Sequence, residues 1–292
     1  MTVLEQFPEI TKANVPLAPF THLRIGGPAE FFVEPQTVAE LTAVLEFAGK
    51  NKIPLRVFGG GVNLVIRDET IFGIVMRLTA PAFTEIHVDG KRVKAGCGAK
   101  LAELVSETAR HGLAGFETLV GIPATVGGAL RCNAGDRSGD MGQFVLRVEV
   151  LDEQGAVSVR ERDELRFGEH SSNLDDPVLL SAEFALDNDS ADAIVKRMRK
   201  AWIHRRASEP LPFEHAARVF QNPRGQSATA LLEQAGVARA KVGKAEVSSR
   251  NANYIVTHDG ATARDVLALM DLMREKVVET SGVELVPELV SW

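Results

Sequence analysis

The sequence predicts an α+β fold with more than one domain. Amphipathic helix patterns stand at residues 37–50, 101–112 and 262–280, and two hairpin patterns, at residues 86–95 and 147–159, lie between them. Hairpins produce antiparallel strand pairs, whereas parallel strands need a helical crossover, so this order favours an α+β architecture. With 292 residues, the chain is long enough for two or three domains, each with its own core.

We predict a βαβ-like unit in residues 1–80. An amphipathic helix over residues 37–50 is followed by apolar strands at residues 55–58 and 71–76. The apolar side chains of the helix recur at a period of about 3.6 residues, which places them on one face. These side chains belong to Val38, Leu41, Val44, Leu45 and Ala48.

Residues 81–188 are predicted to form a second α+β domain and residues 189–292 a third. The Asp89-Gly90 pair stands between two alternating apolar and polar stretches. Such a pair is a strong signal for a two-residue hairpin turn, because both positions tolerate a positive φ. The acidic stretch at residues 187–192 is the predicted linker to the third domain.

The third domain is predicted to end in a long helix over residues 262–280. Thr262 and Asp265 resemble a capping box, although Asp is a weaker choice than Glu at the second position. One face of the helix is apolar, and we interpret its two Met residues as core residues. The residues of this face are Val266, Leu269, Met270, Met273 and Val277.

Composition and charge argue against several classes of function. A net charge of -6 gives no electrostatic basis for binding nucleic acid or an anionic membrane. The N-terminus lacks a signal-peptide pattern, and no apolar run is long enough to span a bilayer. Cys97 and Cys132 have no Cys-x-x-Cys spacing, and the histidines have no ligand spacing, so no metal site is expected. We expect a cytoplasmic protein without nucleic-acid or membrane partners.

Two glycine-rich segments, residues 57–68 and 121–135, are the main functional signal. Glycine adopts a positive φ and lets backbone N–H groups approach a ligand closely, so such segments can surround a phosphate. Two of them indicate a diphosphate held between two parts of the protein, and therefore a dinucleotide.

Neither segment has a standard nucleotide-binding pattern. The run Gly59–Gly61 lacks the third glycine of the Rossmann pattern, and residues 63–67 are predicted to form a strand instead of a phosphate-capping helix. No Gly-Lys-Ser/Thr sequence is present, which excludes a P-loop. A tight turn at Gly59–Gly61 and close packing at Gly127-Gly128 would explain each segment taken alone. The two together with their flanking residues favour a ligand.

These flanking residues resemble the UDP-N-acetylenolpyruvoylglucosamine reductase (MurB) family, which uses FAD in the synthesis of peptidoglycan precursors. The resemblance implies a two-domain FAD-binding module of the MurB/FAD-linked oxidase type, followed by a C-terminal α+β substrate-binding domain. It also implies noncovalent FAD, NADPH as the hydride donor and a UDP-sugar substrate. The sequence does not specify the oligomeric state, and we expect a monomer. The resembling segments are residues 19–29, both glycine segments, and residues 219–223, 231–236, 247–256 and 282–288.

The resemblance assigns the two glycine segments to the cofactor. The first would face the FAD diphosphate and the second would line the opposite wall and the isoalloxazine. Val62 and Ala124 depart mildly from the family, which usually has Ser and Gly there. The implied cofactor-binding residues are Gly59, Gly60, Gly61, Asn63, Gly121, Pro123, Thr125, Gly127, Gly128, Asn133 and Gly135.

The implied catalytic positions depart further. The family uses Arg and Glu to stabilise the enolate that forms on hydride addition, and Ser to protonate it. Here Glu288 is retained, but His170 stands where Arg is expected and Arg218 where Ser is expected. Glu169 replaces the family's Tyr. The implied substrate-binding residues are Arg206, Gln221 (Lys in the family) and Asn222.

Two interpretations of these substitutions remain open. In a rearranged site, Arg218 carries the charge of the substrate carboxylate and enolate, while His170 or Glu288 delivers the proton. In the other interpretation the site has lost its reductase role, and His170 and Arg218 are ordinary surface residues. The rival functions are a flavoprotein with another substrate and a noncatalytic protein that binds flavin or a UDP-sugar.

Overall fold

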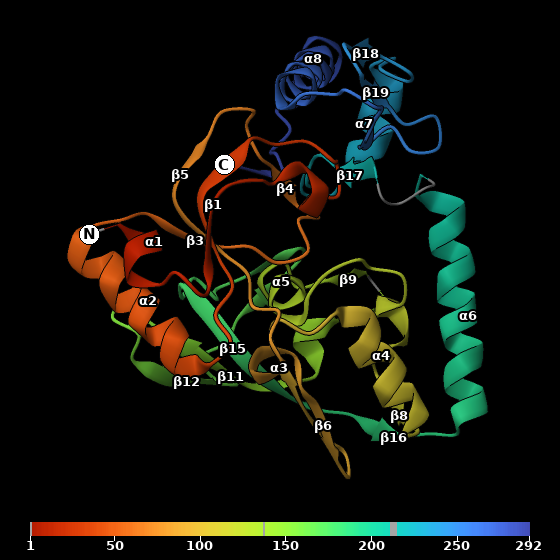
Figure 1. Ribbon diagram of the computed structural model, residues 1–292. Helices are drawn as coiled ribbons and strands as arrows, with labels where there is room; N and C mark the ends of the chain where they lie inside the picture. Colours follow the sequence, from red (N-terminus) through yellow and green to blue (C-terminus); the bar gives the residue numbers. More distant parts are fainter. Residues whose placement is uncertain (1, 137, 211–214) are drawn as a thin grey trace. The chain divides into compact units, whose positions relative to one another are not determined.

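The structure is a computed structural model that describes residues 2–136, 138–210 and 215–292 and divides into two compact units (Figure 1). Unit 1 contains residues 1–13, 30–60 and 72–204, and unit 2 contains residues 14–29, 61–71 and 205–292. The chain therefore passes from unit 1 to unit 2 inside the first glycine segment, between Gly60 and Gly61. The division into three domains at residues 80 and 188 stays a prediction.

A four-stranded sheet in the order β1-β2-β5-β3 occupies the N-terminal part of the chain. Its helix α2 begins after Thr37, whose side chain accepts a hydrogen bond from the Glu40 N–H, and it ends at Lys52 in the left-handed conformation. The predicted helix face is buried except for Val38 in the first turn, which is exposed. The elements are α1 (Val3–Gln6), β1 (Thr11–Pro16), η1 (Ala18–Phe20), β2 (Pro28–Val33), α2 (Val38–Asn51), β3 (Leu55–Val57), β4 (Leu64–Val65) and β5 (Ile71–Met76).

An antiparallel five-stranded sheet in the order β12-β11-β15-β7-β6 forms the centre of unit 1. Both predicted hairpins are confirmed, since β6 pairs with β7 and β11 pairs with β12. The first turn lies one residue later than expected, because Asp89 pairs with Arg92 and the loop is Gly90-Lys91. Gly90 has φ +56, as the turn requires. The strands are β6 (Ile86–Asp89), β7 (Arg92–Gly96), β11 (Val145–Leu151), β12 (Val157–Glu161) and β15 (Val178–Ala185).

Short elements complete unit 1 around this sheet. The acidic stretch predicted as a linker forms β16 and the start of α6 instead of an open segment. Its carboxylates are bound by basic residues, since Asp187 pairs with Lys91 at 3.1 Å and Asp189 with Arg197 at 2.8 Å. The elements are α3 (Pro81–Thr84), α4 (Leu101–Arg110), β8 (Leu113–Ala114), η2 (Glu117–Leu119), α5 (Val126–Arg131), β9 (Gly135–Asp136), β10 (Gly139–Asp140), η3 (Met141–Gln143), β13 (Phe167–Gly168), β14 (Ser171–Ser172), β16 (Asp187–Asn188) and α6 (Ala191–Ser208).

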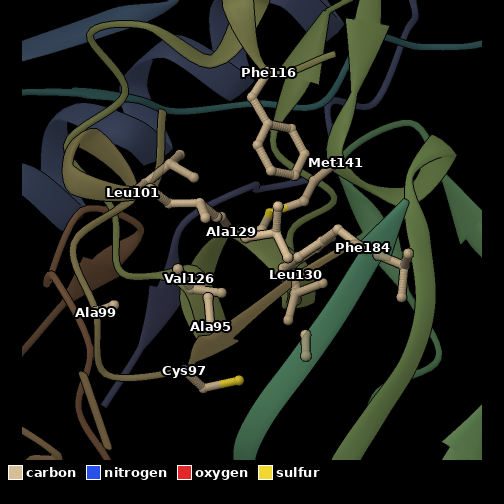
Figure 2. Packing of buried hydrophobic residues seen from close by; sticks show 14 of the residues in the cluster. Ala95, Cys97, Ala99, Leu101, Phe116, Val126, Ala129, Leu130, Met141 and Phe184 are labelled. Carbon is tan, nitrogen blue, oxygen red and sulfur yellow. The ribbon is translucent and has the colours of Figure 1, made fainter. Parts of the chain in front are cut away.

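The main core of unit 1 packs helices α4 and α5 against the five-stranded sheet (Figure 2). Three aromatic rings meet edge to face in it, with Phe116 at 5.5 Å from Phe144 and 5.2 Å from Phe184 between ring centroids. Cys97 is also buried here, and burial raises the pKa of its thiol, so the group is a packed thiol and not a reactive thiolate.

Unit 2 is built on an antiparallel sheet in the order β17-β20-β19-β18 with helices α7 and α8. The capping box at Thr262 and Asp265 is confirmed, and α8 ends at Gly282 with φ +69. A parallel pair, β4 with β21, attaches the C-terminus to the segment that follows Gly61. The elements are β17 (Ala216–Arg218), α7 (Ala228–Gln234), β18 (Lys241–Val242), β19 (Ala245–Val247), β20 (Tyr254–Thr257), α8 (Ala263–Ser281) and β21 (Val290–Ser291).

Within residues 2–136, 138–210 and 215–292, no helix has the length and apolar character needed to cross a bilayer. The same residues contain no group of His, Cys, Asp or Glu side chains that could hold a metal ion.

Asp68 provides a testable contribution to the stability of unit 2. Its carboxylate accepts hydrogen bonds from the N–H groups of Ala263 and Arg264, at 2.9 and 3.2 Å, in the first turn of α8. Replacing Asp68 by Ala leaves these donors without that partner and removes an anion from the helix N-terminus, so we expect a loss of about 1–2 kcal/mol of unfolding free energy. Urea unfolding followed by circular dichroism measures this loss.

Asp271→Ala is the matched control, because Asp271 is exposed on the same helix and, among the described residues, forms an ion pair with Arg274 alone. We expect a change below about 0.5 kcal/mol for it. Equal losses for the two variants would contradict the role of Asp68.

Candidate active site

The two glycine segments meet inside unit 1. A Cβ atom added to Gly59 would lie 2.8 Å from Oγ1 of Thr125, so a side chain at residue 59 would require Thr125 to shift. Thr125 caps α5, since its Oγ1 accepts a hydrogen bond from the Gly128 N–H at 3.2 Å. In the described part of unit 1, the backbone N–H groups of Gly59 and Gly60 make no hydrogen bond. The first segment therefore has donors to offer a diphosphate.

The second glycine segment uses its donors within the protein. The N–H groups of Val126 and Gly127 donate to the carbonyls of Ala99 and Cys97, each at 2.8 Å. A Cβ atom on Gly127 would lie 3.0 Å from the Cβ of Cys97, so close packing explains this glycine. These donors of the second segment are thus used within the protein, and a position opposite the first segment across the cofactor stays a prediction.

The other predicted residues of these segments shape the backbone. Gly61 has φ +62 and its carbonyl accepts from the His22 N–H at 2.9 Å, and Gly121 has φ +82. Pro123 is exposed, and Gly128 lies in the first turn of α5. Positive φ values explain the glycines at residues 61 and 121, since other residues adopt them at a cost.

Asn133 and Gly135 make contacts that join neighbouring loops of unit 1. The Asn133 amide donates to the carbonyl of Gly168 and accepts from the N–H of Gly142, both at 2.8 Å, and the residue is 4% exposed. A Cβ atom on Gly135 would lie 2.4 Å from the Cα of Asp140. Asn133 thereby fixes the position of the β13–β14 hairpin. Contact of these two residues with the cofactor stays a prediction.

His170 lies in the turn of that hairpin. Phe167 pairs with Ser172 and Gly168 with Ser171, so Glu169 and His170 form the connection. His170 is half-buried and has φ +51, a left-handed conformation that non-glycine residues adopt infrequently. Residue 170 belongs to unit 1, whereas Arg218 and Glu288 belong to unit 2.

Within unit 2 the structure brings Arg218 and Glu288 together. The segment of Glu288 runs beside β17, because the Glu288 N–H donates to the Val219 carbonyl at 2.7 Å and the Gln221 N–H to the Val286 carbonyl at 2.9 Å. This pairing places Nε of Arg218 at 3.1 Å from Oε2 of Glu288. The side chains are 24% and 13% exposed, so the pair is partly shielded from water.

Asn63 belongs to the same constellation. Its Nδ2 donates to the Glu288 carbonyl at 2.9 Å, and its carbonyl accepts from the Val290 N–H at 3.0 Å. The residue predicted to face the cofactor therefore also positions the segment that carries Glu288.

The predicted substrate-binding residues occupy the surface of unit 2. Gln221 is exposed, and Asn222 accepts a hydrogen bond from the Ala228 N–H at 3.1 Å at the start of α7. Arg206 is exposed near the end of α6, and its carbonyl accepts from the Arg250 guanidinium at 2.8 Å. Asn222 is thus used structurally, while Gln221 and Arg206 are open to solvent.

The sequence did not identify two residues of unit 2, Arg205 and Tyr254, as neighbours of the predicted site residues. Arg205 pairs with Glu209 at 2.6 Å and is 15% exposed, although its i,i+4 spacing is visible in the sequence. Tyr254 stands opposite Arg218 in the β17–β20 register. Its place beside Arg218 follows from the pairing of two strands that are distant in the sequence.

Comparisons with known proteins agree over nearly the whole chain. The FAD binding domain model matches residues 29–159, and the model of the UDP-N-acetylenolpyruvoylglucosamine reductase C-terminal domain matches residues 209–292. The chain is 41% identical to UDP-N-acetylenolpyruvoylglucosamine reductase 2 of Symbiobacterium thermophilum over 279 residues, 95% of this chain and 90% of that protein. It is 34% identical to the reductase of Rhodopirellula baltica over 295 residues, 100% and 97% of the two chains.

A solved structure leads to the same assignment. The crystal structure of UDP-N-acetylenolpyruvylglucosamine reductase (MurB) from Thermus caldophilus superimposes with a TM-score of 0.82 and 35% identity, covering 96% of this chain and 98% of that one. The match to this structure and to both domain models confirms the α+β architecture expected from the sequence. The chain belongs to the UDP-N-acetylenolpyruvoylglucosamine reductase family.

Proposed function

We propose that this protein reduces UDP-N-acetylglucosamine enolpyruvate to UDP-N-acetylmuramate, with noncovalently bound FAD as the cofactor and NADPH as the hydride donor. The relatives at 34–41% identity support the reaction in peptidoglycan precursor synthesis. A monomer in the cytoplasm is part of the same proposal. The observation that carries the active-site part is the ion pair of Arg218 with the family's retained Glu288.

The glycine segments fit a dinucleotide. The contact between Gly59 and Thr125 leaves no room for a side chain, and the N–H groups of Gly59 and Gly60 can donate to diphosphate oxygens. In this proposal Gly121, Pro123 and Gly127 line the opposite wall. Bound FAD would accept hydride from NADPH and return it to the substrate.

Arg218 and Glu288 suit the charge that the reduction creates. Hydride addition to the enol ether leaves negative charge next to the substrate carboxylate, and a partly buried guanidinium stabilises that charge strongly. The Arg218 side chain cannot act as the proton donor, because a guanidinium does not release its proton at physiological pH. The proton therefore has to come from another group, for which the sequence offered His170 or Glu288. Arg206, Gln221 and Asn222 are assigned to the UDP part of the substrate.

The first test uses the purified natural protein. We expect the visible absorption of bound flavin and NADPH oxidation that accelerates when the enolpyruvyl substrate is added. Bound flavin with turnover of another substrate would favour a divergent flavoprotein, and bound ligand without turnover a noncatalytic one. A colourless protein that FAD does not reconstitute would contradict the central proposal.

Gly59→Ala tests the glycine contact. The new Cβ would clash with Thr125 Oγ1, so we expect FAD affinity to fall at least about tenfold, measured by quenching of flavin fluorescence. Gly49→Ala is the control, because its Cβ would meet only the Glu153 carbonyl, at the ordinary distance of 3.4 Å. Unchanged FAD affinity in Gly59→Ala would remove the first segment from the binding site.

Arg218→Ala tests the rearranged site. We expect kcat/KM for the enolpyruvyl substrate to fall about 100–1,000-fold while reduction of the flavin by NADPH is unaffected, because only the second half-reaction develops the enolate charge. Arg274→Ala on α8, where Arg274 pairs with Asp271, is the control. If steady-state reduction is unchanged in Arg218→Ala, the rearranged site is wrong. The double change His170→Arg with Arg218→Ser restores the usual family pattern. We expect it to be more active than Arg218→Ala.

A further inference from the structure

The unit 2 sheet presents a tyrosine beside the Arg218–Glu288 pair. Ala217 and Ile255 are neighbours in the β17–β20 register and are buried in the core with α7 and α8. Side chains alternate along a strand, so the next pair in the register, Arg218 and Tyr254, points to the opposite face of the sheet. Directly opposed residues on antiparallel strands lie side by side, which places the Tyr254 ring next to Arg218.

Charged groups surround the Tyr254 hydroxyl in unit 2. Burial raises the pKa of the phenol, and Glu209 raises it further. Arg218 and Arg205 lower this pKa and Glu288 raises it, with smaller effects than burial. The balance is a raised pKa, so the phenol keeps its proton throughout the neutral range.

The neighbouring groups cannot serve as the proton source for the reduced substrate. The Arg218 guanidinium stays protonated at physiological pH. Glu288 is the anionic partner of an ion pair with Nε of Arg218 at 3.1 Å, and a carboxylate has no proton to give. The Tyr254 O–H is a proton donor on the same face and next to the same pair.

We propose that the Tyr254 hydroxyl is the proton donor in the reduction, in place of the serine that is replaced by Arg218. Hydride addition to one carbon of the enolpyruvyl double bond leaves an electron pair on the other carbon. That pair takes the phenolic proton, so the O–H bond breaks and a C–H bond forms. The phenolate that remains takes a proton from water. This inference rests on the proposed function and replaces His170 and Glu288 as the proton source.

Tyr254→Phe removes only the hydroxyl and keeps the packed ring. We expect kcat for the enolpyruvyl substrate to fall at least about 100-fold, with KM changed less than about threefold. Reduction of the flavin by NADPH should be unchanged, which also shows that the variant is folded. Val256→Ala, two residues along the same strand face, is the control and should keep kcat within about twofold.

The second measurement uses the fact that the chain contains one tyrosine. Biosynthetic replacement of tyrosine by a fluorinated tyrosine keeps the ring and hydroxyl but makes the phenol a stronger acid, and it changes residue 254 alone. If Tyr254 must be protonated, the alkaline loss of kcat moves to lower pH in the fluorinated protein. A purely structural role for the ring leaves the pH profile where it was.

The outcomes separate the two proposals. If the natural protein does not reduce the enolpyruvyl substrate, the proposed function fails and this inference fails with it. If the natural protein reduces it, unchanged kcat in Tyr254→Phe, or an unmoved alkaline limb in the fluorinated protein, rejects Tyr254 as the proton donor and leaves the proposed function standing.

Discussion

The C-terminal segment, residues 286–292, joins parts of unit 2 that lie far apart in the sequence. Its backbone bonds to Val219, directly after β17, and to Val65 of β4, and the Arg67 N–H donates to the Trp292 carbonyl at 3.0 Å. Each bond is worth only about 0.5–1.5 kcal/mol net, but together they set one register for the segment. That register decides where Glu288 lies, and through it the position of the ion pair with Arg218.

The ion pair in turn limits the chemical roles of Arg218 and Glu288. Removing one member of a shielded pair leaves the other charge uncompensated, so Arg218 and Glu288 act as a unit and the effects of substituting them are not additive. A guanidinium has five N–H donors, so pairing through Nε is compatible with contact to a substrate carboxylate. A site built on this pair has strong charge stabilisation and needs its proton from a third group, which we assign to Tyr254.

Glycines in the two segments pack against different neighbours and use their N–H groups differently. Gly59 has no side chain because Thr125 occupies the space, and its N–H group is available to a ligand. Gly127 has none because Cys97 packs against it, and its N–H group is already bonded. Both interpretations of a glycine-rich segment, ligand binding and close packing, were drawn from the sequence. The structure shows close packing at both glycines, whereas of the two only Gly59 has an N–H group without a hydrogen bond in the described part of the chain.

The sequence by itself determined the local elements and the family. Apolar periodicity specified helices α2 and α8, and Thr262 with Asp265 specified the start of α8, because each depends on residues close together in the chain. The Asp89-Gly90 pair specified a hairpin, although its turn lies at Gly90-Lys91. The tertiary structure alone decided that Asp187 of β16 pairs with Lys91, that Glu288 pairs with Arg218, and that Tyr254 stands opposite Arg218 in the β17–β20 register. Those arrangements depend on pairing between segments that are distant in the sequence. A local sequence pattern does not specify which residues of two such segments lie opposite each other.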